Sequence, residues 1–137
     1  MESEKSNLLH AGLSKKIIET YFKVYNKLGY GFLENVYEKS LLIELHNAGL
    51  NSIRQKKLKV YYDDHEVGLY FADILVENKI IIEIKAAKGL LPEHENQLLN
   101  YLKATEIEVG LLINFGTKPE FRRKIFENKF KYPFRPV

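Results

Sequence analysis

The stretch DILVENKIIIEIKA, residues 73–86, determines how the rest of the chain is organised. It is mostly aliphatic, as strands buried in a sheet are, yet it carries Asp73 at one end and Glu83 and Lys85 near the other. Only residues 77–79 are available for a turn between its two apolar halves. We therefore predict a tight antiparallel hairpin whose charged side chains need an explanation.

The length of the turn decides whether these charges meet. Side chains alternate along a strand, so Glu83 and Lys85 share one face. If residues 77–79 form the turn, Asp73 lies directly opposite Glu83, with Cβ atoms ~4.5–5.5 Å apart. A two-residue turn at 78–79 instead places Asp73 on the other face. The sequence leaves both registers open, but only the three-residue turn accounts for all three charges together.

Helical and strand-like patterns flank this hairpin. Residues 13–28 have helical spacing, with Ser14 as the expected N-cap, and a second helix is predicted at 33–48. The predicted strands are 57–62, 67–76, 79–86 and 109–115, and the later predicted helices are 92–104 and a short one that contains Arg122, Arg123 and Lys124, with Thr117 and Glu120 as its capping box. A strand, a helix and a strand in succession favour parallel pairing. The expected fold class is α/β, with a mixed sheet of about four strands flanked by helices.

The bulk properties set the class of protein. A length of 137 residues favours one compact domain, which we expect at 13–137 after a flexible N-terminus at 1–12. The absence of cysteine excludes a disulfide framework, a thiolate metal site and a cysteine nucleophile. No apolar run of signal-peptide type or of membrane-spanning length occurs, so we expect a cytoplasmic protein without membrane contact. A net charge of +3 is compatible with nucleic acid but does not argue for it.

A pair of carboxylates on an apolar sheet indicates a chemistry. Two like charges side by side are costly unless a cation or a proton neutralises them. Mg²⁺ takes hard oxygen ligands and completes its shell with water and substrate phosphate, and Mn²⁺ is the expected substitute. A metal held in this way polarises a phosphate and activates a water, and the neighbouring Lys85 can stabilise the phosphate charge or position that water. The spacing therefore predicts a site for phosphodiester hydrolysis.

The same residues match a known pattern. Asp73, nine residues and then Glu83-Ile84-Lys85 resemble the D…E-x-K signature of the PD-(D/E)XK nuclease superfamily, with Ala72 in place of its proline. GFLENVY, residues 31–37, resembles G-x-x-E-x-x-Y, which names a family of small proteins in that superfamily. HENQLLNYLKA and GLLINFG look like later segments of that family, so the resemblance runs from about residue 13 to 126. It implies a restriction-endonuclease-like fold.

The resemblance also implies a role for each hairpin residue. Asp73 and Glu83 would be the metal ligands, and the backbone carbonyl of Ile84 would be a further ligand. Lys85 would be the catalytic lysine.

Two helices would contribute the remaining site residues. Glu34 would be an additional acid and metal ligand from the helix that precedes the sheet. Gln97 and Tyr101 look like the Q-x-x-x-Y motif of RecB-type nucleases, and their i, i+4 spacing places them on one helical face together with His94. An amide and a phenol can orient water, a carboxylate or a phosphate.

Plainer interpretations stand beside these roles. Glu83 and Lys85 could belong to a solvated edge strand, Asp73 could end a strand, and Glu34 could be an acid favoured by a helix dipole. Tyr37 is expected to pack in the core, and the acidic run 63–66 is expected to be a turn rather than a metal cluster. Two basic groups, Arg54, Lys56, Lys57 and Lys59 in one and residues 122–124 in the other, fit either a solvated surface or a phosphate-binding role.

Three functional hypotheses follow. The first is a Mg²⁺-dependent nuclease, acting on DNA in preference to RNA, with low or structure-based sequence specificity and a homodimer as one arrangement. The second is a catalytically inactive module of the same fold that binds nucleic acid or protein. The third is an oligomerisation protein with an unrelated partner.

Overall fold

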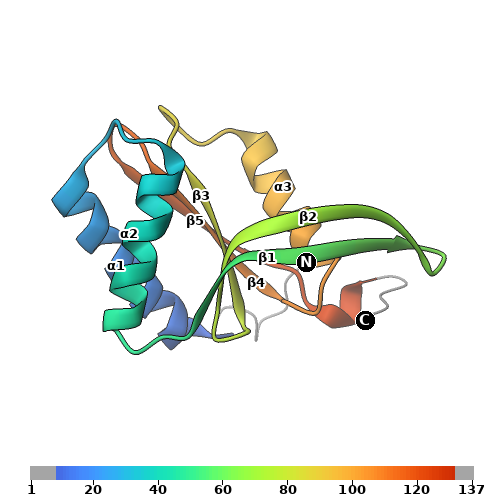
Figure 1. The fold of residues 1–137 in the computed structure, drawn as a ribbon. Helices are drawn as coiled ribbons and strands as arrows, with labels where there is room; N and C mark the ends of the chain where they lie inside the picture. Colours follow the sequence, from blue (N-terminus) through green and yellow to red (C-terminus); the bar gives the residue numbers. More distant parts are fainter. Residues whose placement is uncertain (1–8, 132–137) are drawn as a thin grey trace.

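The computed structural model describes residues 9–131. Its helices and strands follow the order α1 (Ala11–Leu28), α2 (Glu34–Asn47), β1 (Ser52–Tyr62), β2 (His65–Val76), β3 (Ile80–Lys85), α3 (Pro92–Lys103), β4 (Val109–Phe115) and β5 (Pro119–Ile125), followed by a 3₁₀ turn at Asn128–Phe130. The strands form one sheet in the order β1-β2-β3-β4-β5 (Figure 1). Only β3 and β4 are parallel, as the strand–helix–strand succession predicts.

Helices cover both faces of the sheet. On one face α1 and α2 pack against alternate residues of β3 and β4, such as Ile82 and Leu111. On the other face α3 packs against Ile81 and Leu112. Glu83 and Lys85 have the same parity as Ile81, so their side chains point to the face that carries α3.

The turn between β2 and β3 has three residues. Val76 pairs with Ile80 and Ile74 with Ile82, and residues 77–79 form the turn. Glu77 and Asn78 both adopt the left-handed backbone region, with φ of 51° and 55°. The register predicted from the three charges is confirmed, and the two-residue turn is excluded.

The β1–β2 hairpin is much longer than the strand beside it. β3 pairs with β2 only over residues 74–76, whereas β1 and β2 stay paired to a two-residue turn at Asp63 and Asp64. Residues 56–72, which we call the arm, therefore extend beyond the rest of the sheet (Figure 1). At the base of the arm Gln55 has a φ of 53°, and the regular pairing skips Gln55 and Asp73. The two strands twist here. Ile74 and Ala72 would share a face in a regular strand, yet Ile74 faces α2 and Ala72 lies on the side of α3.

The last predicted helix is wrong. Residues 119–125 form β5, which pairs antiparallel with β4 from Phe115↔Pro119 to Val109↔Ile125, so the sheet has five strands. Thr117 and Glu120 consequently form no capping box, and Arg122, Arg123 and Lys124 lie on an edge strand. The open edge of β4 offers hydrogen bonds that a local helical pattern does not take into account.

The start of the first helix also differs from the prediction. α1 begins at Ala11, after His10 with a φ of 53°, and Ser14 is a buried residue inside the helix rather than its N-cap. Of the predicted N-terminus, residues 1–8 lie outside the described residues. Within residues 9–131 no helix is both long and apolar enough to cross a membrane.

Candidate active site

The two hairpin carboxylates meet where the backbone pairing of β2 and β3 ends. The backbone N–H of Asp73 donates to Glu83 Oε1 at 3.1 Å, and the N–H of Ile84 donates to Asp73 Oδ2 at 2.8 Å. Each carboxylate thus accepts a backbone bond that a carbonyl would otherwise accept in a continuing ladder. This exchange fixes both side chains and holds their oxygens close together.

Burial makes the pair electrostatically unusual. Glu83 is only 4% exposed, and burial, reinforced by the negative charge of Asp73, raises the pKa of Glu83 to about 8. Burial also raises the pKa of Asp73, against the N–H of Ile84, which lowers it. The raised pKa values of both acids mean that the site lacks the positive charge that would stabilise two carboxylates.

A chain of side chains leads from the sheet to α3. Lys85 Nζ donates to Gln97 Oε1 at 3.2 Å, and Gln97 Nε2 donates to the Tyr101 hydroxyl at 2.9 Å. Tyr101 in turn packs against Tyr70 of β2, with ring centroids 5.6 Å apart. The i, i+4 pair predicted from sequence therefore lies on the face of α3 that contacts Lys85, and it orients that amine.

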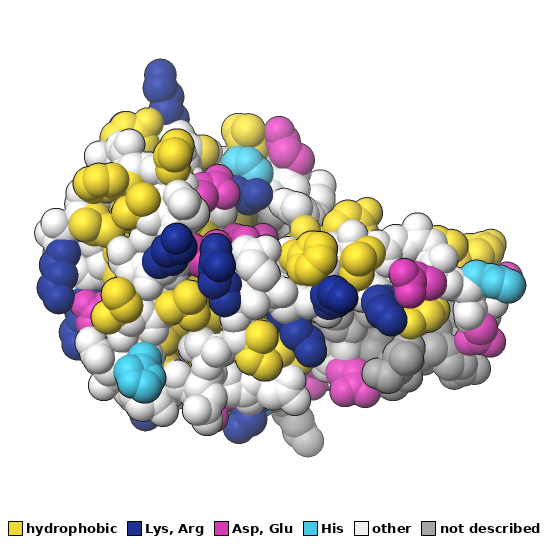
Figure 2. Space-filling model, viewed as in Figure 1, with side chains coloured by type: hydrophobic (Ala, Val, Ile, Leu, Met, Phe, Trp, Pro, Cys, Tyr) yellow, Lys and Arg dark blue, Asp and Glu magenta, His cyan; other side chains and the backbone are white. Residues whose placement is uncertain are grey.

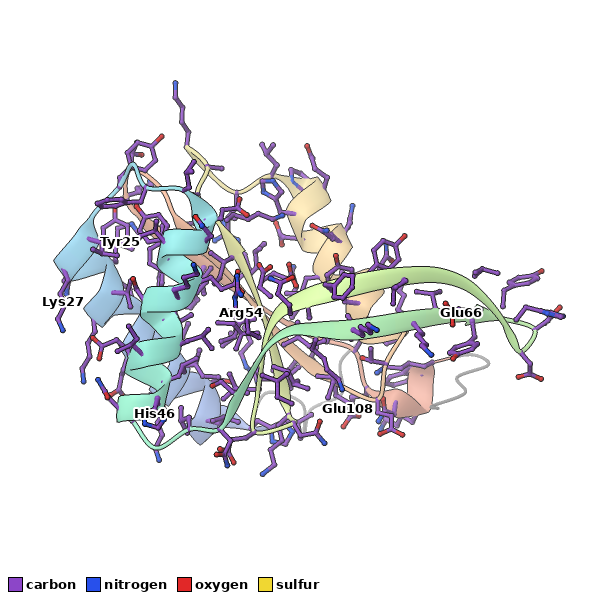
Figure 3. The ribbon with its side chains drawn as sticks, in the orientation of Figure 1. Tyr25, Lys27, His46, Arg54, Glu66 and Glu108 are labelled. Carbon is purple, nitrogen blue, oxygen red and sulfur yellow. The ribbon has the colours of Figure 1, made fainter. Side chains whose placement is uncertain are left out.

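A second network on the α2 side escaped the sequence reasoning. Buried Glu38 accepts from Arg54 Nε at 2.7 Å and from Gln55 Nε2 at 3.1 Å, and Gln55 Nε2 also lies 3.4 Å from Asp73 Oδ1. Figure 3 shows Arg54 at the base of the arm, next to α2. The sequence signal was a glutamate at a core position of α2, next to Tyr37 and in line with Leu41 and Leu45. Its partners could not be foreseen, because they come from the twisted base of the arm.

Glu34 lies at the first position of α2 and is exposed. Its charge, after that of Glu38, raises the pKa of Asp73, so it lies within electrostatic range of the pair. Tyr37, one turn further on, is fully buried, stacks on Phe115 with centroids 4.1 Å apart and donates to the carbonyl of Gly29 at 2.6 Å. The expectation that Tyr37 packs in the core is confirmed, and this packing anchors the loop that leads to Glu34.

The loop after β3 is fixed by one buried amide. Asn114 of β4 accepts from the N–H of Ala87 at 2.9 Å and donates to its carbonyl at 3.0 Å. His94 does not join the Gln97–Tyr101 hydrogen bond. Its Nδ1 accepts from the N–H of Leu91 at 3.0 Å at the start of α3. Asn114 was not predicted as important, although a lone amide in an otherwise apolar strand was the available signal.

The residues present fit a magnesium-type ion. No three His, Asp or Glu side chains gather into a complete ligand set within residues 9–131, and the acidic run 63–66 is a turn, as expected. Mg²⁺ needs no such set, since it is usually held by one or two carboxylates plus water and phosphate. Asp73 and Glu83 supply two carboxylates whose pKa values are raised, and a divalent cation would stabilise their ionised form. Figure 2 shows acidic and basic side chains gathering between α2 and α3.

A family model places this geometry among known proteins. The model described as PD-(D/E)XK nuclease superfamily matches residues 11–124. The chain belongs to the PD-(D/E)XK nuclease superfamily. The match spans all the predicted site residues from Glu34 to Tyr101, and the five-stranded mixed sheet flanked by helices is consistent with the restriction-endonuclease-like fold. No curated protein and no solved structure matches the chain.

Membership in the PD-(D/E)XK superfamily supports a hydrolase that acts on phosphodiester bonds, with a nucleic acid as substrate. The superfamily generally uses divalent metals such as Mg²⁺. The resemblance to the G-x-x-E-x-x-Y family and the role of each residue stay predictions.

Proposed function

We propose that this protein is a metal-dependent nuclease that hydrolyses phosphodiester bonds, with DNA favoured over RNA. The observation that carries the proposal is the Asp73–Glu83 pair, a half-buried and a buried carboxylate that each accept a backbone hydrogen bond from the other strand, with Lys85 beside them. A member of the PD-(D/E)XK superfamily that retains both acids and the lysine has the parts needed for cleavage. The small size of the chain favours low or structure-based sequence specificity.

The proposed roles divide between the sheet and the helices. Asp73 and Glu83 would hold the ion, with the carbonyl of Ile84 and the carboxylate of Glu34 as further ligands. Bound Mg²⁺, or Mn²⁺ as its substitute, supplies a Lewis acid that polarises the phosphate and lowers the pKa of water.

On α3, Gln97 holds Lys85 through its amide oxygen, and Tyr101 holds the amide of Gln97. Lys85 then stabilises charge on the phosphate or positions the attacking water.

The decisive experiment is cleavage of a substrate panel by the wild type and by Lys85→Ala. The panel contains linear, single-stranded, supercoiled and branched DNA and RNA, each with Mg²⁺, Mn²⁺ or a chelator. We expect metal-dependent cleavage that Lys85→Ala abolishes without lowering Tm, because Lys85 is only partly buried and sits at the end of its strand.

Lys79→Ala is the matched control, since Lys79 is an exposed lysine in the turn of the same hairpin. It should cut like the wild type. Equal cleavage by wild type and Lys85→Ala would overturn the proposal. Tight binding of the panel without cleavage in either metal would favour an inactive binding module instead.

A further inference from the structure

The arm exposes a surface that the candidate active site does not use. Lys57 pairs across the strands with Phe71, and Lys59 pairs with Leu69. These four side chains share one face, which we call the outer face of the arm. Phe71 is 44% exposed and Leu69 is 46% exposed, although both are large apolar residues. Figure 2 shows basic and hydrophobic side chains side by side along the arm.

The opposite face of the arm contacts α3 at its base, although Tyr70 on that face stays half exposed. Leu58 is buried in the cluster that contains Ala72 and Tyr101, and Tyr70 packs on the Tyr101 ring. The arm is therefore held against the α3 side of the molecule at its base, and its outer face is presented to solvent. Residues 9–131 leave close to half of Phe71 and of Leu69 open to solvent.

Within residues 9–131 the positive charge of the outer face is only weakly neutralised. Lys57 makes no ion pair or side-chain hydrogen bond with any described residue, and Lys59 reaches Glu66 only at 3.8 Å, between two half-exposed side chains. Figure 3 shows Glu66 toward the far end of the arm. A pair of this kind contributes little. The outer face thus keeps a positive charge beside its apolar residues.

The other basic group of the chain is engaged in intramolecular contacts. On β5, Arg122 pairs with Glu120 at 3.1 Å and Lys124 pairs with Glu95 of α3 at 2.5 Å. Arg123 lies 3.3 Å from the hydroxyl of Ser14 and donates to the carbonyl of Leu9. These contacts join β5 to the helices. Of the two basic groups in the sequence, the lysines of the arm are the ones left available.

The mixture of positive charge and apolar surface indicates which kind of ligand the outer face would bind. A second copy of the chain that covered Phe71 and Leu69 would also bury or crowd Lys57 and Lys59, which is costly without acids to meet them. A nucleic acid offers phosphates to the lysines. The bases of a single strand are free to stack on an aromatic ring, whereas those of a duplex are covered by their neighbours. The outer face therefore fits a single strand better than a duplex or another copy.

The outer face begins next to the candidate active site. Phe71 lies two residues from Asp73 along β2, and Leu69 lies two residues further, so the steps are about 7 Å each. The side chains of β2 change face between Ala72 and Ile74, so a nucleic-acid strand held at Asp73 would follow this twist and meet Phe71 first and then Leu69.

We propose that the outer face of the arm binds a single-stranded segment of nucleic acid that continues from the candidate active site. The proposal rests on the proposed nuclease function and names its substrate class, nucleic acid with an unpaired strand beside the scissile phosphate. Phe71 stacks on a base, and Lys57 and Lys59 contact the phosphates that flank it.

The test measures binding separately from cleavage. Fluorescence anisotropy in chelator follows the full chain with a labelled single strand of about 20 nucleotides and with the blunt duplex of the same sequence. We expect the single strand to bind more tightly than the duplex. Phe71→Ala should weaken single-strand binding by about tenfold, which is typical when one base no longer stacks on a ring, and should change duplex binding less than twofold.

The two lysines are tested through salt dependence. Lys57→Ala with Lys59→Ala should reduce the slope of log affinity against log salt by about 0.7 for each phosphate that is no longer neutralised. The matched controls are Lys15→Ala with Lys16→Ala, two exposed lysines on α1, and Ile43→Ala, an exposed apolar residue on α2. All three control substitutions should leave single-strand affinity within about twofold of the wild type.

Several results would overturn the inference. One is a Phe71→Ala protein that binds the single strand like the wild type, and another is a duplex bound as tightly as the single strand. A third is an arm variant that changes a dimer into a monomer by light scattering with unchanged single-strand affinity. Failure of the nuclease proposal looks different, because binding through the arm would persist while no condition gives cleavage.

Discussion

The chemistry of the candidate active site begins with one residue, Glu83, held nearly out of water. Its neighbours explain why its pKa is high, since burial acts first and the charge of Asp73 acts second. An acid whose pKa is raised on folding binds more protons in the folded than in the unfolded state. Its ionisation therefore destabilises the fold until a cation compensates.

The stability of the metal-free protein should consequently depend on pH through Glu83. Stability contributed by the protonated carboxyl is complete below the unfolded pKa of 4.5 and is lost as pH rises toward about 8. Within this window we expect the free energy of unfolding to fall by at most about 1.4 kcal/mol for each pH unit. Denaturant titrations from pH 5 to pH 8.5 measure it.

Glu83→Gln is the control, because it removes the titration and keeps the shape of the side chain. As pH rises, the free energy of unfolding of the wild type should fall relative to that of Glu83→Gln. Added Mg²⁺ should oppose the loss in the wild type at high pH and do little for the variant. A wild type that gains stability relative to Glu83→Gln as pH rises would contradict this account.

Gln55 is the residue that connects the buried Glu38 to Asp73. Gln55→Ala should lower cleavage by about 10- to 100-fold and shift the metal requirement to higher Mg²⁺ concentration, the range seen when support for a metal ligand is removed. Tm should hardly change, since Gln55 is exposed and Arg54 still pairs with Glu38. Titration of activity against Mg²⁺ measures the effect.

Asn100→Ala, which removes an exposed amide on α3, should cut normally and serves as the control. If Gln55→Ala cut like Asn100→Ala at every metal concentration, the link from Gln55 to Asp73 would have no functional role.

At the scale of elements, β4 determines where the candidate active site can be built. It pairs with β3 through Glu83↔Leu112 and Lys85↔Asn114, and its Asn114 fixes the loop after β3 at Ala87. The next residue but one, Gly116, comes so close that a Cβ atom there would lie 2.5 Å from the carbonyl oxygen of Ala87. Close packing of this strand end thus positions the segment that follows Lys85.

Gly116→Ala should destabilise the protein by about 1–3 kcal/mol, because the added Cβ would clash with the carbonyl oxygen of Ala87 and with the buried amide of Asn114. It should also reduce cleavage, because the same Cβ would displace the Asn114 amide that holds the loop at Ala87. Gly12→Ala in α1 is the opposite case, since a Cβ there has nothing within 4 Å. That helix substitution should raise stability by about 0.5–1 kcal/mol. Equal effects of Gly116→Ala and Gly12→Ala on Tm would show that the loop at Ala87 can move to accept the extra methyl group.

Elements also show how far the sequence could predict the structure. The sequence left two hairpin registers open, and the structure has the one that accounts for Asp73, Glu83 and Lys85 together. The segment 119–125 was mistaken for a helix, since its strand form depends on the distant edge of β4. The Glu38 network was missed for a similar reason. It needs a left-handed backbone at Gln55, which no local rule assigns to a glutamine.

At the scale of the whole molecule, the helix-covered sheet and the arm are built differently. Both hydrophobic clusters draw on residues from the helices and the sheet, and neither contains a residue between Leu58 and Ala72. The arm is stabilised by its own pairing and by its base. Its length is therefore not needed to hold the candidate active site together.

A shortened arm tests this separation. Replacing residues 61–67 with Asn-Gly joins Val60 to Gly68, which already pair across the strands, through a favoured two-residue turn. We expect the free energy of unfolding to change by less than about 1 kcal/mol. Leu58→Ala is the contrast and should cost about 2–5 kcal/mol, because Leu58 is buried at the base. Unfolding of the shortened protein at ambient temperature would contradict the separation.

The hydrogen bond from Ile84 to Asp73 provides a spectroscopic probe within the chain. This amide proton points at a carboxylate oxygen and not at a carbonyl. Its chemical shift and its exchange with solvent will thus follow the charge and the position of Asp73. A single NMR resonance can report a metal ion arriving, a proton leaving or the removal of the Gln55 side chain, in a protein that has been given no substrate at all.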